Sequence, residues 1–298
     1  MSLRVCILGA AAGGGLPQWN CGCENCCLAR CGEIPAQTQS SVCVSTVNDS
    51  VALINASPDV RQQITTSPFL SPTGPRVSPI KSVLLTNGDI DHIAGLLSLR
   101  EQQPFSLFAT PEIHEILAAN PILDALNSAY VKRSAVALNH PFELVTGVTA
   151  TLYAVPGKVP LYLEGATVET QLEGEQTVGV HLTDGSSDAH YIPGCAALTP
   201  ALRARLQGSD LVMFDGTLWQ DDEMVTAGLS QKTGARMGHM SMSGATGSMA
   251  GFSNLEVAQK VFVHMNNTNP VLRPTSAQRA EAQSEGWAIG HDGMEISL

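Results

Sequence analysis

The 298-residue sequence predicts an α/β fold with two sheets, in a single domain that spans residues 1–298. Apolar runs of strand length recur from one end of the chain to the other, and segments with helical spacing separate them. No linker of low complexity and no repeat of fixed period interrupts this alternation. These observations favour one layered domain over two separate ones.

The individual elements follow from periodicity, caps and turn residues. We expect strands at residues 4–8, 41–45, 51–54, 82–85, 105–109, 148–155, 178–183, 191–192, 211–214, 261–263, 287–290 and 294–297. We expect helices shortly after Asp59 and at residues 93–100, 110 onward, 199–208 and 276–284. The glycine-rich stretch 9–15 lacks the Gly-Lys-Ser/Thr of a phosphate loop, so it is expected to line a pocket.

Composition excludes several classes of function. The apolar fraction of 44 % suits a sizeable core, and the net charge of -11 without any basic run argues against nucleic acid as a partner. No apolar stretch reaches the length of a membrane span, and the first residues lack the charged start of a signal peptide. We therefore expect a cytoplasmic protein whose eight cysteines are metal ligands or free thiols.

A cysteine knuckle at about residues 20–31 carries the first metal-binding pattern. Cys21, Cys23 and Cys26 form a C-x-C-x-x-C motif, and three thiolates on so short a loop can share one tetrahedral zinc ion. Cys27, Cys31 or a distant side chain must complete the shell, and a site closed by four protein ligands is structural. The alternative is a set of reduced, partly buried thiols.

The turn at residues 86–92 carries the second pattern. An apolar strand ends just before Asp89, Asp91 and His92, and a helix follows them. Sites in α/β sheets form at the carboxyl ends of strands, and carboxylate and imidazole groups that converge there can bind a divalent metal. The alternative is a polar turn that caps the helix.

Two later strands deliver similar side chains. Asp215 ends the strand 211–214, and His264 follows the strand 261–263. His239 lies on a loop rich in Gly, Ser and Met, residues 234–247, which we expect to be mobile. Because these positions are all strand ends or neighbouring loops, we expect the side chains to meet the 86–92 turn.

The residues Thr-Asn-Gly-Asp-Ile-Asp-His-Ile-Ala-Gly-Leu, 86–96, together with Asp215, His239 and His264, resemble the metallo-β-lactamase superfamily. Its signature turn is H-x-H-x-D-H, and the resemblance implies a four-layer αβ/βα sandwich over nearly the whole chain. Further segments resemble a branch of this superfamily that acts in pyrroloquinoline quinone biosynthesis. These segments are residues 11–26, 55–59, 215–219, 237–239 and 264–270.

The chain departs from the superfamily at one of its two metal sites. Asn87 and Asp89 stand where the signature has its first two histidines. The expected third histidine is missing at residues 156–158, and the expected bridging aspartate is missing at residues 193–195. The other site keeps its ligands Asp91, His92 and His264.

Two histidines and one carboxylate with open positions form the ligand set of non-haem Fe(II) oxygenases, whereas a two-metal hydrolase needs both clusters. The resemblance implies iron-dependent hydroxylation of a tyrosine-derived precursor, a cross-linked Glu–Tyr unit. Asp89 is expected to act as a further ligand or to orient a bound water. Asp215 is expected to support the ligands or accept a proton, and His239 to act as the acid/base or substrate-orienting group.

Cations near His239 complete the predicted site. Arg236 and Lys232 are candidates to hold substrate carboxylates, and the alternative is a solvated loop. Relatives with the cysteine knuckle on this fold hold a structural zinc that helps to form a dimer, so the resemblance implies a homodimer. In a phosphodiesterase branch the fourth zinc ligand is a histidine three residues after the counterpart of His264. Asn267 stands there in this chain, so either Asn267 or another group fills the shell.

Two other functions stay open at this point. One is a non-catalytic carrier for pyrroloquinoline quinone or its precursor, on the way to the periplasm. The other is a hydrolase that works through one metal such as Zn(II), without oxygen. The ligand types alone do not choose the metal, because His/Asp sites bind divalent ions broadly.

Overall fold

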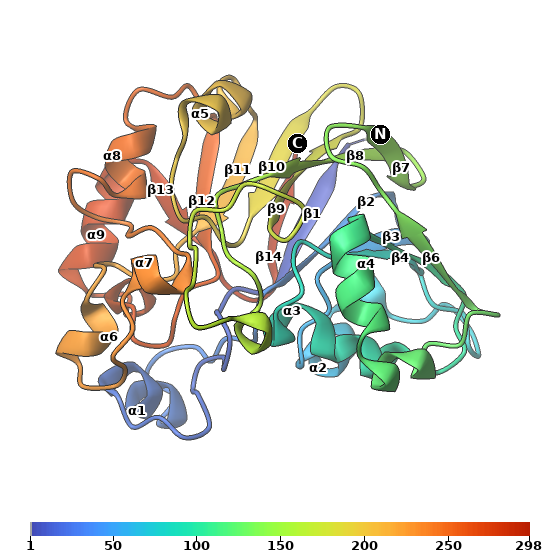
Figure 1. Ribbon diagram of the computed structural model, residues 1–298, viewed down its shortest axis with the longest axis horizontal. Coiled ribbons are helices and arrows are strands. Elements are labelled where there is room, and N and C mark those ends of the chain that lie inside the picture. The colour runs from blue at the N-terminus through green and yellow to red at the C-terminus, as the bar shows by residue number, and fades with distance from the viewer. Residues whose placement is uncertain (1) are drawn as a thin grey trace.

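Two seven-stranded sheets form the centre of the molecule in this computed structural model, which describes residues 2–298 (Figure 1). The first sheet has the order β14-β1-β2-β3-β4-β5-β6 and the second the order β13-β12-β11-β10-β9-β8-β7. The strands of the first sheet are β1 Arg4–Gly9, β2 Ser41–Val47, β3 Ser50–Ile54, β4 Ile80–Leu84, β5 Phe105–Ala109, β6 Val131–Ala135 and β14 Met294–Ser297. The strands of the second are β7 Pro141–Val145, β8 Val148–Ala154, β9 Val178–Thr183, β10 Asp188–Ile192, β11 Leu211–Asp215, β12 Gln259–Val263 and β13 Trp287–Ile289.

Short helices cover the outer faces of both sheets. The α-helices are α1 Glu24–Arg30, α2 Val60–Thr66, α3 Ile90–Ile93, α4 Pro111–Ala118, α5 Pro200–Leu206, α6 Glu223–Thr226, α7 Gly234–Met237, α8 Ser248–Phe252 and α9 Ala277–Ser284. The 3-10 helices are η1 Pro68–Leu70, η2 Ala94–Leu99, η3 Pro121–Ala125, η4 Leu161–Leu163 and η5 Pro270–Leu272. This is the four-layer αβ/βα sandwich that the sequence predicted.

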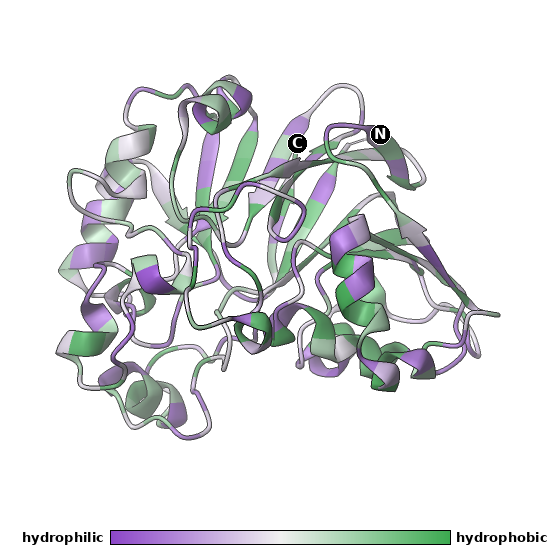
Figure 2. Ribbon diagram, in the orientation of Figure 1, coloured by the Kyte–Doolittle hydropathy of each residue, from purple (hydrophilic) through white to green (hydrophobic). Residues whose placement is uncertain are grey.

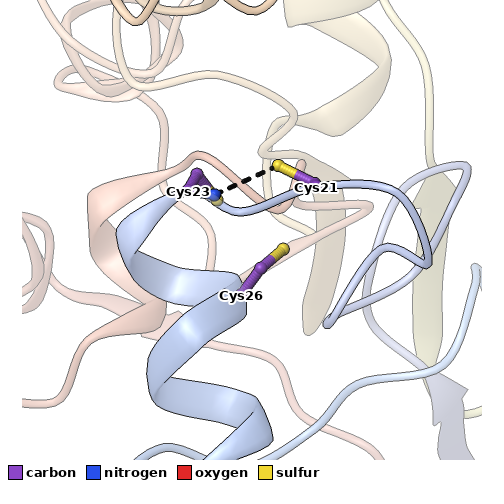
Figure 3. A group of neighbouring side chains, drawn as sticks. All are labelled: Cys21, Cys23 and Cys26. Atoms are coloured by element: carbon purple, nitrogen blue, oxygen red, sulfur yellow. Dashed lines mark hydrogen bonds between the residues drawn. The ribbon is translucent and has the colours of Figure 1, made fainter.

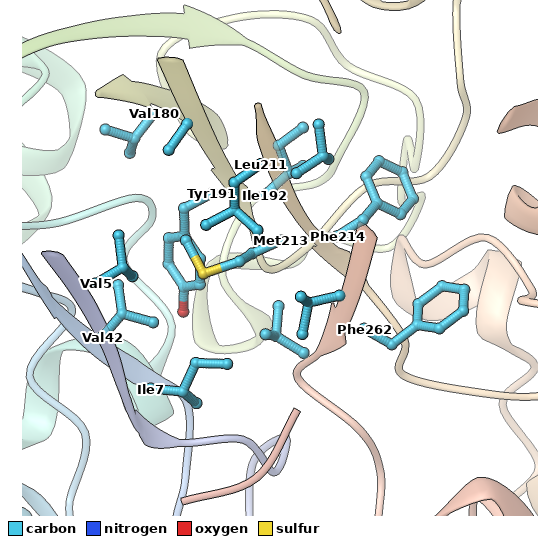
Figure 4. Close-up of a cluster of buried hydrophobic side chains, with 14 of the residues drawn as sticks. Val5, Ile7, Val42, Val180, Tyr191, Ile192, Leu211, Met213, Phe214 and Phe262 are labelled. Atoms are coloured by element: carbon cyan, nitrogen blue, oxygen red, sulfur yellow. The ribbon is translucent and has the colours of Figure 1, made fainter. Parts of the chain in front are cut away.

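The strands are apolar on both faces because one face packs against the other sheet and the opposite face packs against the outer helices. Val5 and Ile7 of β1 face the second sheet, whereas Cys6 and Leu8 face the helices on the outer side. Figure 4 shows Val5, Ile7 and Val42 across from Tyr191 and Met213. The Tyr191 hydroxyl reaches Ser40 Oγ at 2.8 Å, so this buried polar group is hydrogen-bonded. Figure 2 shows hydrophobic residues along the strands and hydrophilic ones on α4 and α9.

Each sheet has an antiparallel and a parallel half. Strands β3 to β6 pair in parallel in the first sheet, as do β10 to β13 in the second. The carboxyl ends of parallel strands meet at one edge, where α/β proteins place their sites. The residues that follow β3, β4, β11 and β12 therefore gather in one region.

Most predicted elements are confirmed, with three corrections. The expected helix 93–100 is a single α-turn, α3, continued by the 3-10 helix η2. A side chain at Gly95 would put its Cβ 2.0 Å from the Ser57 carbonyl oxygen, so the tighter segment fits closely against the neighbouring loop. The strands β6 and β7 were not predicted, and the loop 234–247 begins with the helix α7.

Among residues 2–298, no helix has the length and apolar character that crossing a membrane requires.

Candidate metal centre

Two strand ends bring three polar side chains together. Asp91 and His92 lie on α3, directly after the turn that follows β4, and His264 follows β12. One ligand atom from each of these three residues lies within 4.8 Å of the others. They line a cavity of about 370 Å³, together with Asp89 and His239. The sequence prediction that these side chains converge is confirmed.

The histidine His92 fits a metal ligand better than a hydrogen-bonded core residue. Both its ring nitrogens are buried, and neither has a hydrogen-bond partner. An unpaired buried polar atom costs roughly 1–3 kcal/mol, so native proteins seldom leave one. His92 Nδ1 lies 3.4 Å from Asp91 Oδ1, and a cation shared by His92, Asp91 and His264 would satisfy one nitrogen of the His92 ring, so the three residues fit a divalent ion.

His264 is held in an unusual backbone conformation. Its φ is +57°, in the left-handed region that costs a residue with a side chain on the order of 1–3 kcal/mol. Neighbouring segments fix this conformation, because Met265 N donates to Ala10 O at 2.9 Å and Asn266 N donates to Thr217 O at 2.9 Å. The conformation brings His264 Nε2 to 3.2 Å from Asp91 Oδ2.

A hydrogen-bond chain connects His264 to Asp215 through Thr217. His264 Nδ1 lies 2.9 Å from Thr217 Oγ1, and this hydroxyl donates to Asp215 Oδ1 at 2.6 Å. A hydroxyl that donates to the carboxylate accepts from the ring, so His264 carries its proton on Nδ1 and leaves Nε2 free as a ligand. The sequence analysis missed Thr217, because nothing in its local pattern distinguishes it from other threonines.

Asp215 also orients His239. Its second oxygen, Oδ2, lies 2.7 Å from His239 Nδ1 and accepts from Cys195 N at 2.9 Å, while Oδ1 also accepts from Thr217 N at 3.0 Å. The carboxylate is fully buried, and each oxygen has two donors. His239 therefore presents Nε2 to the cavity that it lines.

Neighbouring charged groups shift the pKa values of Asp91, Asp215 and His239 in the direction opposite to the effect of burial. Burial raises the pKa of Asp91, but the neighbouring His92 and His264 rings outweigh it and hold that pKa well below its usual range. Burial also raises the pKa of Asp215, and His239 outweighs it to give a lowered pKa. Burial lowers the pKa of His239, whereas the Asp215 carboxylate raises it by more. Both aspartates are therefore carboxylates at neutral pH.

Asp89 lies apart from the metal-type groups, although it lines the same cavity. Its backbone N donates to Asn87 Oδ1 at 2.9 Å, and its Oδ1 accepts from Leu161 N at 3.3 Å. The geometry thus gives no support to Asp89 as a further ligand. The glycine loop does line the cavity, because a Cβ on Gly13 would stand 3.3 Å from Asp91 Oδ2.

His239 is fixed more firmly than its glycine-rich loop predicted. Helix α7 precedes it, His239 N donates to Gly234 O at 3.0 Å, and Met240 N donates to Cys195 O at 2.8 Å. The sequence predicted a mobile loop here. These backbone hydrogen bonds, together with Asp215, instead hold His239 in place.

The two predicted cations differ in position. Lys232 lines the cavity, whereas Arg236 is not part of its lining and donates from Nη2 to Glu164 Oε2 at 3.0 Å. Two residues that sequence reasoning missed, Lys158 and Glu164, complete this part of the wall. Their roles come from a tertiary contact that no local motif encodes.

The cysteine knuckle forms a separate group. The sulfur atoms of Cys21, Cys23 and Cys26 lie within 4.8 Å of one another, and Figure 3 shows them converging at the start of α1. Asn267 Nδ2 lies 3.2, 3.4 and 3.3 Å from the three sulfurs, at the open vertex of the group. The amide oxygen occupies the same place after a rotation of the side chain. The group therefore fits a zinc shell of three thiolates and Asn267, whereas Cys27 and Cys31 lie outside it.

Comparison with known proteins agrees with this geometry. Residues 52–265 match the family model described as "Beta-lactamase superfamily domain". A protein of Ruegeria pomeroyi named "Coenzyme PQQ synthesis protein B" is 56 % identical over 296 residues, which cover 99 % of this chain and 100 % of that protein.

Solved structures give the same result. The crystal structure of Zn(2+)-bound PqqB from Methylobacterium extorquens has a TM-score of 0.97 and 51 % identity, over 99 % of this chain and 100 % of that one. A diphosphatase of the PhnP family, at 18 % identity and a TM-score of 0.71, shares the fold over 100 % of this chain and 98 % of its own. This chain therefore belongs to the β-lactamase superfamily and, within it, to the family of coenzyme PQQ synthesis protein B.

Proposed function

We propose that this chain acts in the biosynthesis of pyrroloquinoline quinone, as an Fe(II)-dependent hydroxylase of a tyrosine-derived precursor. The place in biosynthesis is supported by the names of relatives that match over their whole length. The reaction is supported by the site. A divalent metal is supported by the Zn(2+)-bound relative and by the residue groups that can hold an ion.

One observation carries the choice of chemistry. Asp91, His92 and His264 supply two imidazoles and one carboxylate, and neither nitrogen of His92 has a hydrogen-bond partner. This ligand set leaves positions open for further ligands, as in non-haem Fe(II) oxygenases. Fe(II) held there supplies the redox chemistry with dioxygen that hydroxylation needs.

A two-metal hydrolase fits the residues less well. Such an enzyme needs a second set of ligands to clamp the attacking and leaving oxygens. Asp215 has donors on both oxygens, Asn87 Oδ1 accepts from the backbone N of Asp89, and Asp89 Oδ1 accepts from Leu161 N. Asp215 therefore has no oxygen left for a second metal, and Asn87 supplies no carboxylate.

The other residues of the cavity have roles that need no second metal. His239 accepts the phenolic proton of the substrate at Nε2, because Asp215 holds Nδ1 and stabilises the imidazolium that forms. Thr217 keeps the His264 ring in the ligand tautomer. Asp89 orients a water or the substrate from the edge of the cavity.

Oxygen uptake tests the proposal. The metal-stripped protein is reloaded anaerobically with Fe(II), offered L-tyrosine or L-dopa with ascorbate, and compared with the His264→Ala variant. Hydroxylation inserts one oxygen atom of dioxygen into a ring C–H bond and reduces the other to water, so ascorbate supplies the two electrons. We expect uptake coupled to a hydroxylated product, and none with Zn(II) or in the variant.

The two alternatives make different predictions. A carrier would bind the quinone tightly, show no uptake with either substrate, and keep its affinity after the Fe(II) is removed. A hydrolase would work with Zn(II) in the absence of oxygen. Either result would overturn the hydroxylase proposal.

A further inference from the structure

A cluster of three cations around one carboxylate borders the cavity that holds the metal ligands. Glu164 Oε1 lies 3.0 Å from Lys158 Nζ, and Oε2 lies 3.0 Å from Arg236 Nη2 and 4.0 Å from Lys232 Nζ. Lys158, Glu164 and Lys232 line the cavity together with Asp91, His92 and His264. Three positive groups thus gather beside one small cavity in a chain whose net charge is -11.

Glu164 does not neutralise this cluster. Three cations face one carboxylate, which leaves an excess of positive charge. The side chains of Lys158 and Glu164 are only 12 % and 8 % exposed, so water screens them weakly. The hydrogen bond from Arg236, opposed by partial burial, lowers the pKa of Glu164 to about 2, so this side chain is a fixed anion.

Hydrogen-bond donors are left over in the cluster. Lys158 Nζ contacts Glu164 and donates to Val159 O at 3.2 Å, which leaves part of its capacity free. Lys232 Nζ is too far from Glu164 for a hydrogen bond and has no other partner within residues 2–298. Arg236 Nη1 is buried without a hydrogen-bond partner. Unused charged donors beside a cavity match the oxygens of an anionic ligand.

We propose that Lys158 and Lys232 form a carboxylate-binding subsite of the metal cavity, with Glu164 and Arg236 as the residues that position the two lysines. The ligand it takes is an aromatic molecule whose carboxylate binds the lysines while its ring lies toward Asp91, His92 and His264. This inference rests on the proposed function for the choice of a phenol as the aromatic part. Glu164 acts as the resident counter-ion and competes with the ligand for the lysines.

Binding to the Zn(II)-loaded protein tests the subsite without any turnover. Isothermal titration calorimetry compares L-tyrosine, 3-(4-hydroxyphenyl)propionate, which lacks the amine, and tyramine, which lacks the carboxylate. We expect both carboxylates to bind more tightly than tyramine, and more weakly as salt is added. Lys232→Met and Lys158→Met should each weaken the two carboxylates by about tenfold or more, a loss of about 1.4 kcal/mol, and leave tyramine nearly unchanged.

Two further variants sharpen the result. Glu164→Gln removes the competing negative charge, so we expect it to tighten carboxylate binding several-fold, whereas a purely structural Glu164 would weaken it. Lys132→Met removes a positive charge from the exposed face of β6, away from the cavity lining, and should change nothing. It controls for net charge.

Three outcomes would overturn the subsite. These are carboxylate affinity that is unchanged in both lysine variants, equal loss of all three probes, and no binding of either carboxylate by the wild-type protein. Because Zn(II) supports no oxidation, the measurement is independent of the oxygen-uptake assay. Carboxylate-selective binding without hydroxylation would overturn the proposed function alone, and hydroxylation without lysine-dependent binding would overturn the subsite alone.

Discussion

The two groups of metal-type residues in the cavity share His264 but differ in how their polar atoms are satisfied. In the Asp91–His92–His264 group, both nitrogens of His92 lack a hydrogen-bond partner. In the Asp215–His239–His264 group, both oxygens of Asp215 are saturated by donors from Thr217, Cys195 and His239. The residue types are nearly the same, so the hydrogen bonds distinguish them.

This difference shows how one cavity can use some residues to bind an ion and others to orient neighbouring side chains. Ligand atoms that no protein group satisfies favour a cation, because the folded chain otherwise leaves them buried and unpaired. Saturated groups instead fix the ring orientation and proton position of their neighbours. The comparison assigns Asp91 to the ion and Asp215 to His239 and His264, and each assignment has a direct test.

The largest effect is expected from Asp91→Asn. The change keeps the shape and removes the charge of a ligand, so affinity for the active-site metal should fall on the order of 100-fold or more. Metal content per chain, measured after dialysis, should lose the active-site ion and keep the ion of the knuckle. The matched variant Asp215→Asn should keep both, and loss of the active-site ion there to the same extent would show that the second group also coordinates.

The next largest effect is expected on the turnover rate, after substitution of His239. His239→Gln keeps a hydrogen bond to Asp215 but removes the base, so the turnover of the Fe(II)-loaded protein should fall by about 10²–10⁴-fold. Metal content should not change, and the limb of the pH–rate profile that reports His239 should disappear. A variant that loses metal in step with rate would place His239 among the ligands instead.

Thr217→Val should have a smaller effect, because it acts through His264. The substitution nearly conserves volume and leaves His264 Nδ1 and Asp215 Oδ1 without the hydroxyl. Loss of such a partner typically weakens metal binding by about 10–100-fold. Competition with a chelator measures the affinity, and Thr217→Ser should restore it. Wild-type affinity in the Val variant would refute the role of the hydroxyl.

The sequence predicted that the candidate metal ligands converge because they follow recognisable strands. Asp91, His92 and His264 come directly after apolar runs, and the carboxyl ends of such strands meet in any parallel sheet. The glycine loop beside Asp91 could be predicted for the same reason, since repeated glycines mark a close approach of the backbone.

The supporting residues could not be predicted in this way. Thr217, Lys158 and Glu164 act through contacts between segments that lie far apart in the chain, and no spacing rule records those contacts. The strands β6 and β7 lie at the outer ends of their sheets; β6 was missed because it is rich in polar residues, and β7 because it begins with a proline. Tertiary pairing overrode their weak strand propensity.

The smallest expected effect is on the pH dependence of stability, and it concerns His190, a buried histidine outside the metal cavity. His190 lies on β10, where its Nδ1 is 3.0 Å from the Tyr153 hydroxyl, and burial, followed by the nearby His181 and Arg205, lowers its pKa from 6.5 to about 3. The folded chain therefore keeps His190 neutral, while the unfolded chain takes up a proton below pH 6.5. This stability is complete above pH 6.5 and is lost progressively as the pH falls toward 3.

Between pH 6.5 and about pH 5, the loss attributable to His190 should be about 2 kcal/mol, from about 1.4 kcal/mol per pH unit. Urea unfolding of the metal-free protein as a function of pH measures it, and His190→Gln should flatten the slope in this range. The exposed His140 is the matched control, and His140→Gln should leave the slope unchanged. If the slope survives in His190→Gln, the acid sensitivity belongs to other histidines whose pKa is lowered by burial, such as His114 and His264.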